Sequence, residues 1–256
     1  MRYWKGSIAL SPTQDYPLLR QVVRSTCVTH RQLYDFLKLD FHAHSRNAFN
    51  NRVLRLVNHK YLVRDEIPYR TEGYVYSISD KGASELIGLG EYFIGPASRP
   101  RDGQIPNAVF HAIELNEIHL ALKRSQQLVH WMPDTEIRSR NELTECGYRK
   151  DYDAVVTVRV AGGERKFALE YERTPKARRQ YVQICADIAA ERAVDRFLYL
   201  VPNYDLLSFL VGCFTTLRRP IYFGLARDFI DRLFDMPVRS TRPGAMMTLQ
   251  DVLLQG

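Results

Sequence analysis

The chain has 256 residues, of which 45% are hydrophobic and 25% charged, the composition of an ordinary globular protein with room for one large domain or two small ones. Its net charge of +7 favours an anionic partner. The longest apolar stretch, 206–217, is interrupted and too short to cross a bilayer, the first residues lack the apolar run of a signal peptide, and the four cysteines form no C-x-x-C pair, so we expect a cytoplasmic protein with free thiols.

Residues 1–90 have the element order of a winged helix-turn-helix domain. Apolar spacing and capping residues predict a helix over 16–25, a second capped by Thr29, a third from the cap Ser45 to about Asn58, strands over 61–66 and 74–79, and a helix capped by Asp80. The segment between the two strands is then a wing, with Arg70 at its tip.

The third predicted helix and its flanks carry five basic residues and no acidic one between Asp40 and Asp65. Arginine and asparagine side chains can read guanine and adenine edges in the major groove. We therefore expect double-stranded DNA as a partner, although a solvated basic surface is the plainer alternative. The predicted contacts are Asn47, Asn51 and Arg55 to bases, and Arg46, Arg52, Lys60 and Arg70 to phosphates.

A linker and a second domain come next. Residues 91–106 hold three prolines and two glycines, a linker composition. Residues 107–256 then predict an α/β domain, made of a helix over 107–125, a strand within 130–140, a β-hairpin, a helix over 175–193, a strand over 196–201, a helix over 204–218, a strand over 221–225 and a helix near 228–234. The chain beyond Pro237 is poorly specified by its pattern.

The predicted hairpin positions the acidic residues. Two segments that alternate polar and apolar residues flank a Gly-Gly pair, a two-residue turn signal. Pairing Ala161 with Glu164 across this turn would set Asp153 opposite Glu172. Since side chains two apart on a strand share a face, the alternate apolar residues would form a single core face on the other side.

Three carboxylates, Asp153, Glu170 and Glu172, would then share one face at the open end of the hairpin. Like charges this close are destabilising, and carboxylate oxygens suit Mg²⁺ or Mn²⁺. A Thr-Pro pair directly after Glu172 predicts a helix N-terminus, which favours a phosphate, and Lys176 in its first turn adds a positive charge. A solvated hairpin end is the alternative interpretation.

This arrangement resembles the catalytic core of the PD-(D/E)XK, or restriction-endonuclease-like, nucleases. In that family an Asp on one strand and an acidic-x-Lys or acidic-x-acidic pair on the next bind a divalent metal. The resemblance implies Asp153, Glu170 and Glu172 as metal ligands and catalytic residues. Glu172 stands where lysine is commoner, a departure that leaves Lys176 to supply the missing positive charge.

Behind a winged helix, the pattern Asp…Glu-x-Glu-x-x-x-Lys is similar to the MobC/TraX-type relaxases of mobilisable and conjugative plasmids, also grouped as replication-relaxation proteins. That resemblance implies metal-dependent nicking of one DNA strand at an origin of transfer, with an accessory mobilisation protein and a coupling protein as partners. The alternatives are a non-catalytic DNA-binding relaxosome accessory factor or plasmid replication or transcription regulator, and an ordinary restriction or repair nuclease.

Two further motifs bear on the nucleophile. Commoner relaxases use a His-hydrophobic-His motif on a central strand with a tyrosine near the N-terminus, whereas His42-Ala43-His44 is predicted to lie between two helices. If the nicked end were held through a phosphotyrosyl bond, a tyrosine near the carboxylates would have to attack; otherwise water activated by the metal attacks. The tyrosines near the carboxylates are Tyr148, Tyr152, Tyr171 and Tyr181. Tyr3 is the tyrosine that would belong to the His-hydrophobic-His motif.

Overall fold

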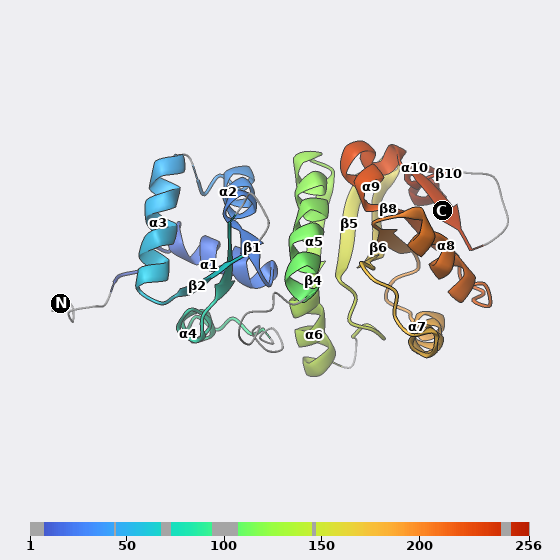
Figure 1. Ribbon diagram of the computed structural model, residues 1–256, viewed down its shortest axis with the longest axis horizontal. Coiled ribbons are helices and arrows are strands. Elements are labelled where there is room, and N and C mark those ends of the chain that lie inside the picture. Colours follow the sequence, from blue (N-terminus) through green and yellow to red (C-terminus); the bar gives the residue numbers. More distant parts are fainter. Residues whose placement is uncertain are drawn as a thin grey trace. The chain divides into compact units, whose positions relative to one another are not determined.

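The chain folds into two compact units, residues 1–120 and 121–256. A computed structural model describes residues 8–43, 45–67, 73–93, 107–144, 147–241 and 247–255 (Figure 1). Each unit combines helices with one β-sheet, of three strands in the first and seven in the second. The predicted fold class, a helical winged unit followed by an α/β unit, is confirmed.

The first unit has winged-helix topology. Its elements are α1 (Asp15–Arg24), β1 (Val28–Thr29), α2 (His30–Leu39), α3 (Arg46–Asn58), β2 (Leu62–Glu66), β3 (Tyr74–Ile78) and α4 (Asp80–Gly88), with sheet order β1-β3-β2. Thr29 caps α2 as predicted, because its hydroxyl accepts the N–H of Gln32 at 3.2 Å. The cap of α4 is Ser79, one residue before the predicted Asp80; the Ser79 hydroxyl accepts the N–H of Gly82 at 3.0 Å.

Helix α5 (Asn107–Arg124) packs against the first unit along most of its length. The side-chain amide of Gln32 donates to the Ile113 carbonyl at 2.8 Å, and that of Asn116 donates to the Cys27 carbonyl at 2.8 Å. The division between the units therefore falls inside α5, after Leu120, instead of before 107. Apolar spacing predicted the helix correctly but carries no information about which sheet or helix it packs on. Of the predicted linker, residues 94–106 lie outside the described ranges.

The second unit is built on a seven-stranded mixed sheet with order β10-β9-β8-β7-β6-β5-β4. Its elements are β4 (Leu128–Pro133), α6 (Asp134–Leu143), β5 (Ala154–Val160), β6 (Gly163–Tyr171), α7 (Arg178–Ala190), β7 (Phe197–Val201), α8 (Tyr204–Cys213), β8 (Ile221–Leu225), α9 (Ala226–Arg232), a 3-10 turn (Leu233–Asp235), β9 (Pro237–Ser240), β10 (Met247–Thr248) and α10 (Leu249–Leu254). Strands β6, β7 and β8 are parallel, with α7 and α8 as the crossovers, and the other neighbours are antiparallel.

Both faces of this sheet are buried, which corrects the prediction of a single core face. On one face Val155, Ala168 and Tyr199 belong to an apolar core that α6, α7 and α8 complete. On the other face Val156 and Leu169 are fully buried as well. A sheet with helical crossovers is covered by helices, so Glu170 in β6 and Glu172 just after it lie in the interior although both are acidic.

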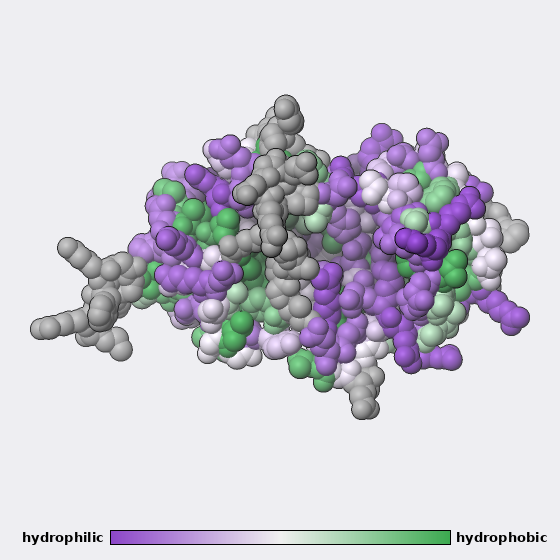
Figure 2. All heavy atoms as spheres, turned by 60° about the horizontal axis from the view of Figure 1, so that its bottom comes forward, coloured by the Kyte–Doolittle hydropathy of each residue, from purple (hydrophilic) through white to green (hydrophobic). Residues whose placement is uncertain are grey.

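The surface is mainly polar. Hydrophilic side chains prevail on the face shown in Figure 2, with smaller hydrophobic areas among them. Within the described ranges, every helix is too short or too polar to span a membrane.

Candidate functional site

The β5–β6 hairpin sets the position of the acidic residues, with a register two residues from the predicted one. Val160 pairs with Gly163 and Val155 with Ala168, so Ala161 and Gly162 form the turn. Gly162 has φ +98°, the left-handed backbone that favours glycine, and its place in the turn decides the register. Because the shift is even, every side chain keeps its predicted face.

In this register Asp153 neighbours Glu170 instead of lying opposite Glu172. Asp153 directly precedes β5, and its Oδ2 accepts the backbone N–H of Tyr171 at 2.7 Å, which joins the two strand ends. The side chains of Glu170 and Glu172 are 7% and 5% exposed. The structure thus gathers the three predicted carboxylates at one end of the hairpin, in a largely buried setting.

Two lysines neutralise the glutamates. Lys176 Nζ contacts Glu172 Oε2, so the lysine lies beside the carboxylates, as predicted. Lys150, which the sequence pattern did not single out, contacts Glu170 Oε1 through its own Nζ. Lys150 lies only three residues before Asp153, and this closeness was the one available signal. We refer to Lys150, Asp153, Glu170, Glu172 and Lys176 as the carboxylate–lysine cluster.

The electrostatics of Glu170 are those of a carboxylate in need of a cation. Burial raises its pKa to about 7; Lys150 opposes this shift and the negative charge of Asp153 adds to it. Burial by itself lowers the pKa of Lys150, but the attraction of Glu170, with help from Asp153 and Glu172, reverses the sign and leaves that pKa raised. The charged Lys150 therefore contacts a Glu170 carboxylate whose negative charge is only partly stabilised by the surrounding protein.

A further buried carboxylate, that of Glu191, holds the segment that carries Lys150. Its Oε2 accepts the N–H of Arg149 at 2.9 Å and the hydroxyl of Tyr152 at 3.2 Å, while its Oε1 accepts the N–H groups of Arg192 and Ala193 at 2.8 and 2.7 Å. Glu191 ties the approach to β5 to the end of α7. No sequence pattern indicates this network, because the partners of Glu191 lie about 40 residues away or on adjacent backbone.

Helix α7 begins later than predicted. Its first residue is Arg178, its N-cap is Ala177, and the chain from 172 to 177 is extended or bent. The predicted Thr174-Pro175 cap does not form, because the helix starts three residues after Pro175. Lys176 lies in this connection, with its N–H donated to the Tyr181 hydroxyl at 3.0 Å. The helix N-terminus is accordingly three residues further from Glu172 than expected.

The donor chemistry of the cluster suits a hard divalent cation, although the predicted three-ligand arrangement is not formed. Mg²⁺ commonly uses one or two carboxylates with water and substrate oxygens. Asp153 and Glu170, adjacent in register, offer such a pair. Among the described residues there is no group of three or more His, Cys, Asp or Glu side chains placed to hold a metal ion, since the Glu172 carboxylate is directed to Lys176.

The tyrosines near the cluster are poor nucleophiles. All four, Tyr148, Tyr152, Tyr171 and Tyr181, are buried. The Tyr152 hydroxyl donates to Glu191, and the Tyr181 hydroxyl accepts from Lys176, with burial raising the pKa of Tyr181 to about 12. Tyr3 and His44, which carry the rival motif, lie outside the described residues.

Helix α3 presents part of the predicted DNA-binding set to solvent. Asn47, Asn51 and Lys60 are exposed. Arg46 is exposed as well, and its guanidinium lies over the Tyr34 ring, 4.4 Å from the centroid, which holds the side chain at the start of the helix. These four residues are exposed and polar or positively charged, as a contact with DNA would require. Arg70 lies outside the described ranges.

Arg52 and Arg55 are engaged within the protein. Asp15 in α1 is fully buried, and its Oδ1 lies 3.4 Å from Arg52 Nε and its Oδ2 2.5 Å from Arg55. The arginines therefore tether α3 to α1. The Arg52 side chain is 14% exposed and that of Arg55 39%, so their predicted contacts to DNA stay predictions. The ion pairs were not predicted, because Asp15 lies far from both arginines in sequence.

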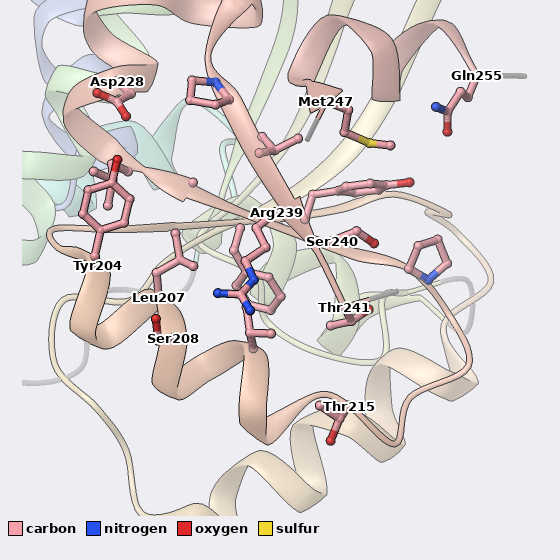
Figure 3. Close-up of a pocket in the computed structure, with 18 residues that line it drawn as sticks. Tyr204, Leu207, Ser208, Thr215, Asp228, Arg239, Ser240, Thr241, Met247 and Gln255 are labelled. Atoms are coloured by element: carbon pink, nitrogen blue, oxygen red, sulfur yellow. The ribbon is translucent and has the colours of Figure 1, made fainter. Parts of the chain in front are cut away.

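A separate cavity of about 900 Å³ lies in the second unit, between α8 and the strands β8 and β9. Tyr204, Leu207 and Ser208 line it from α8, and Arg239 of β9 extends toward that helix (Figure 3). Among the described residues that line this cavity, none belongs to the carboxylate–lysine cluster.

Fold and site together define a winged-helix unit joined to an α/β unit with a buried carboxylate–lysine cluster. No protein-family model and no curated protein sequence matches the chain. Among solved structures, the restriction endonuclease FokI bound to DNA matches over 88% of this chain and 45% of the FokI chain, with 11% sequence identity and a TM-score of 0.27. The chain thus spans less than half of FokI's length. Similarity at that TM-score carries no argument, so the function of this chain has to be inferred from its own residues.

Proposed function

We propose that the protein is a divalent-metal-dependent DNA endonuclease that nicks one strand, with the winged-helix unit as its DNA-binding part. The observation that carries this proposal is the position of the buried Glu170 carboxylate beside Asp153 in the hairpin. Burial raises the pKa of Glu170 to about 7, the charge of Asp153 adds to that shift, and a cation between the two carboxylates would stabilise both. A cation held at such a site can polarise the phosphoryl oxygen of a phosphodiester and activate water for its cleavage.

Each group in the cluster has a distinct task in this proposal. Asp153 and Glu170 would hold Mg²⁺ or Mn²⁺. Glu172 orients Lys176, whose ammonium stabilises negative charge on the phosphoryl oxygens. Water is the favoured nucleophile, since the tyrosine hydroxyls nearby are buried or already hydrogen-bonded.

The exposed residues of the first unit support DNA as the substrate. Asn47 and Asn51 on α3 would contact base edges, while Arg46 and Lys60 would contact phosphates. We further propose, from the resemblance of the Asp…Glu-x-Glu-x-x-x-Lys pattern to the MobC/TraX-type proteins, a relaxase that acts at a plasmid origin of transfer, with an accessory mobilisation protein and a coupling protein as partners.

The test is a nicking assay on supercoiled plasmid carrying the DNA next to the gene in its source replicon. Wild type, Glu170→Ala and a control, Glu164→Ala, are incubated with Mn²⁺ or with chelator. Glu164 is an exposed glutamate of the same strand, in the hairpin turn region. Metal-dependent open circles from wild type and control, but not from Glu170→Ala, are expected. Nicking that survives chelation or the loss of Glu170 would refute the proposed site.

A second candidate is a non-catalytic DNA-binding relaxosome accessory factor or plasmid regulator. The observation in its favour is that lysines already pair with both Glu170 and Glu172, as in a structural ion-pair network. Equal gel shifts by wild type and Glu170→Ala, without nicking by either in the presence of the replicon's accessory proteins, would favour this candidate.

A further inference from the structure

The Lys150–Glu170 pair has features of an internal counter-cation site. The Lys150 ammonium contacts Glu170 Oε1, its side chain is 17% exposed, and its Nζ lies 5.2 Å from the centroid of the Tyr152 ring. The backbone beside it is held by Glu191. A lysine so placed occupies the position of a cation bound to Glu170, which explains why the cluster is stable as the structure presents it.

We infer that Lys150 releases Glu170 when a divalent cation and a DNA phosphate bind together, and that its ammonium then contacts the phosphate. This inference depends on the proposed nuclease function and deepens it, since it names a second phosphate-binding lysine and makes binding of cation and DNA mutually dependent.

The hydroxyl of Tyr199 independently indicates that a ligand belongs here. Tyr199 pairs with Glu170 across β6 and β7, so both side chains lie on the same face of the sheet. Its side chain is buried, and among the described residues its hydroxyl has no hydrogen-bond partner. The charges of Glu170, Glu172 and Asp153 all act on it. A buried hydroxyl without a partner is costly, and water or substrate oxygen at Glu170 would satisfy it.

The charge balance of the cluster also favours binding of a cation and a phosphate together. With all five groups ionised, the three carboxylates and two ammonium groups of the cluster leave one net negative charge. A divalent cation alone would reverse that charge, and a phosphate alone would add to it. A cation and one phosphodiester together bring the cluster to neutrality, so each favours binding of the other in this poorly solvated setting.

Lys150 is the group that couples the two events. While it stays on Glu170, a divalent cation has to compete with it for the carboxylate. Once a phosphate is present, the ammonium has an alternative partner close by, and the penalty for leaving Glu170 falls. Lys176, whose side chain is 40% exposed, is paired with Glu172 and can remain in place.

The test measures Mn²⁺ binding to the full chain by electron paramagnetic resonance, with and without a short phosphorothioate duplex. For wild type we expect the duplex to tighten Mn²⁺ binding by on the order of tenfold. Lys150→Met should bind Mn²⁺ more tightly than wild type by a similar factor without DNA, and the duplex should add little. Lys166→Met, which removes an exposed lysine of β6, is the matched control and should behave like wild type.

Lys150→Arg keeps the positive charge and should retain both the weak Mn²⁺ binding and its dependence on DNA, which guards against a misfolded methionine variant. Unchanged or weaker Mn²⁺ binding by a folded Lys150→Met, checked by circular dichroism, overturns the inference and leaves the nuclease proposal intact if wild type still nicks. Nicking by Glu170→Ala overturns the nuclease proposal whatever the Mn²⁺ titrations show.

Discussion

Glu191→Gln should destabilise the second unit by about 2 kcal/mol, although it changes a single atom. Both carboxylate oxygens of Glu191 accept hydrogen bonds: Oε1 from two backbone N–H groups and Oε2 from the Arg149 N–H and the Tyr152 hydroxyl. The side chain is almost fully buried. A glutamine can place its carbonyl at one of these positions only.

The expected magnitude is set by the number of donors that lose an acceptor. If the glutamine carbonyl keeps the Oε1 position, its amide faces the Arg149 N–H, which loses its acceptor, while the Tyr152 hydroxyl can rotate to accept. One buried donor left without a partner costs about 1–3 kcal/mol. Glu191→Ala removes all four hydrogen bonds. At about 1 kcal/mol or more for each lost bond, the free energy of unfolding should fall by about 4 kcal/mol or more.

The assay is urea unfolding of the full chain in a Trp4→Phe background, followed by fluorescence of Trp131, which is then the single tryptophan and is buried in β4 of the second unit. Glu164→Gln is the control, because Glu164 is exposed and its 3.8 Å ion pair with Arg159 contributes little. A Glu191→Gln protein within about 0.5 kcal/mol of wild type would show that backbone donors do not hold this segment in the way the hydrogen bonds indicate.

Three other predictions concern single groups. Burial raises the pKa of Cys27 to about 12, so its thiol should resist iodoacetamide in the folded protein and react only on unfolding; labelling at the rate of the half-buried Cys213, read by mass spectrometry, would contradict this. Gly82→Ala would put a Cβ 2.3 Å from a backbone carbonyl oxygen and should lower stability by about 1–3 kcal/mol, whereas Gly88→Ala in the same helix meets nothing within 4 Å and should be neutral or stabilising by thermal melting. Burial raises the pKa of Glu170 from 4.5 to about 7, so between these pH values the folded state retains a proton that the unfolded state loses. The free energy of unfolding should therefore fall as pH rises from about 4.5 to about 7. Glu170→Gln should flatten this dependence in urea titrations at several pH values, and an unchanged dependence would exclude Glu170 as its source.

Local signals were sufficient for most of the fold. The Thr29 cap, the apolar spacing of the helices and the alternation of strands predicted the helices of the winged helix, its strands β2 and β3, and most elements of the α/β unit within a few residues. The two-residue strand β1 was not predicted. Helix α6 was missed because residues 130–140 were assigned to a strand, and the elements after Pro237 because they are short. The same alternation placed Asp153, Glu170 and Glu172 on one face, and an even error in register could not change that.

The remaining features depend on contacts between residues distant in sequence. The pairing of Asp15 with Arg52 and Arg55, the packing of α5 on the first unit and the network of Glu191 have no local signature. A sequence pattern shows whether a position is polar or apolar, but the partner of a polar side chain is determined by contacts in the folded chain. The alternation of polar and apolar residues was enough to place the three carboxylates at the same end of the hairpin. The contact between Lys150 and Glu170 depends on tertiary structure, because Lys150 lies in a bend before β5 that is held by the buried Glu191 at the end of α7.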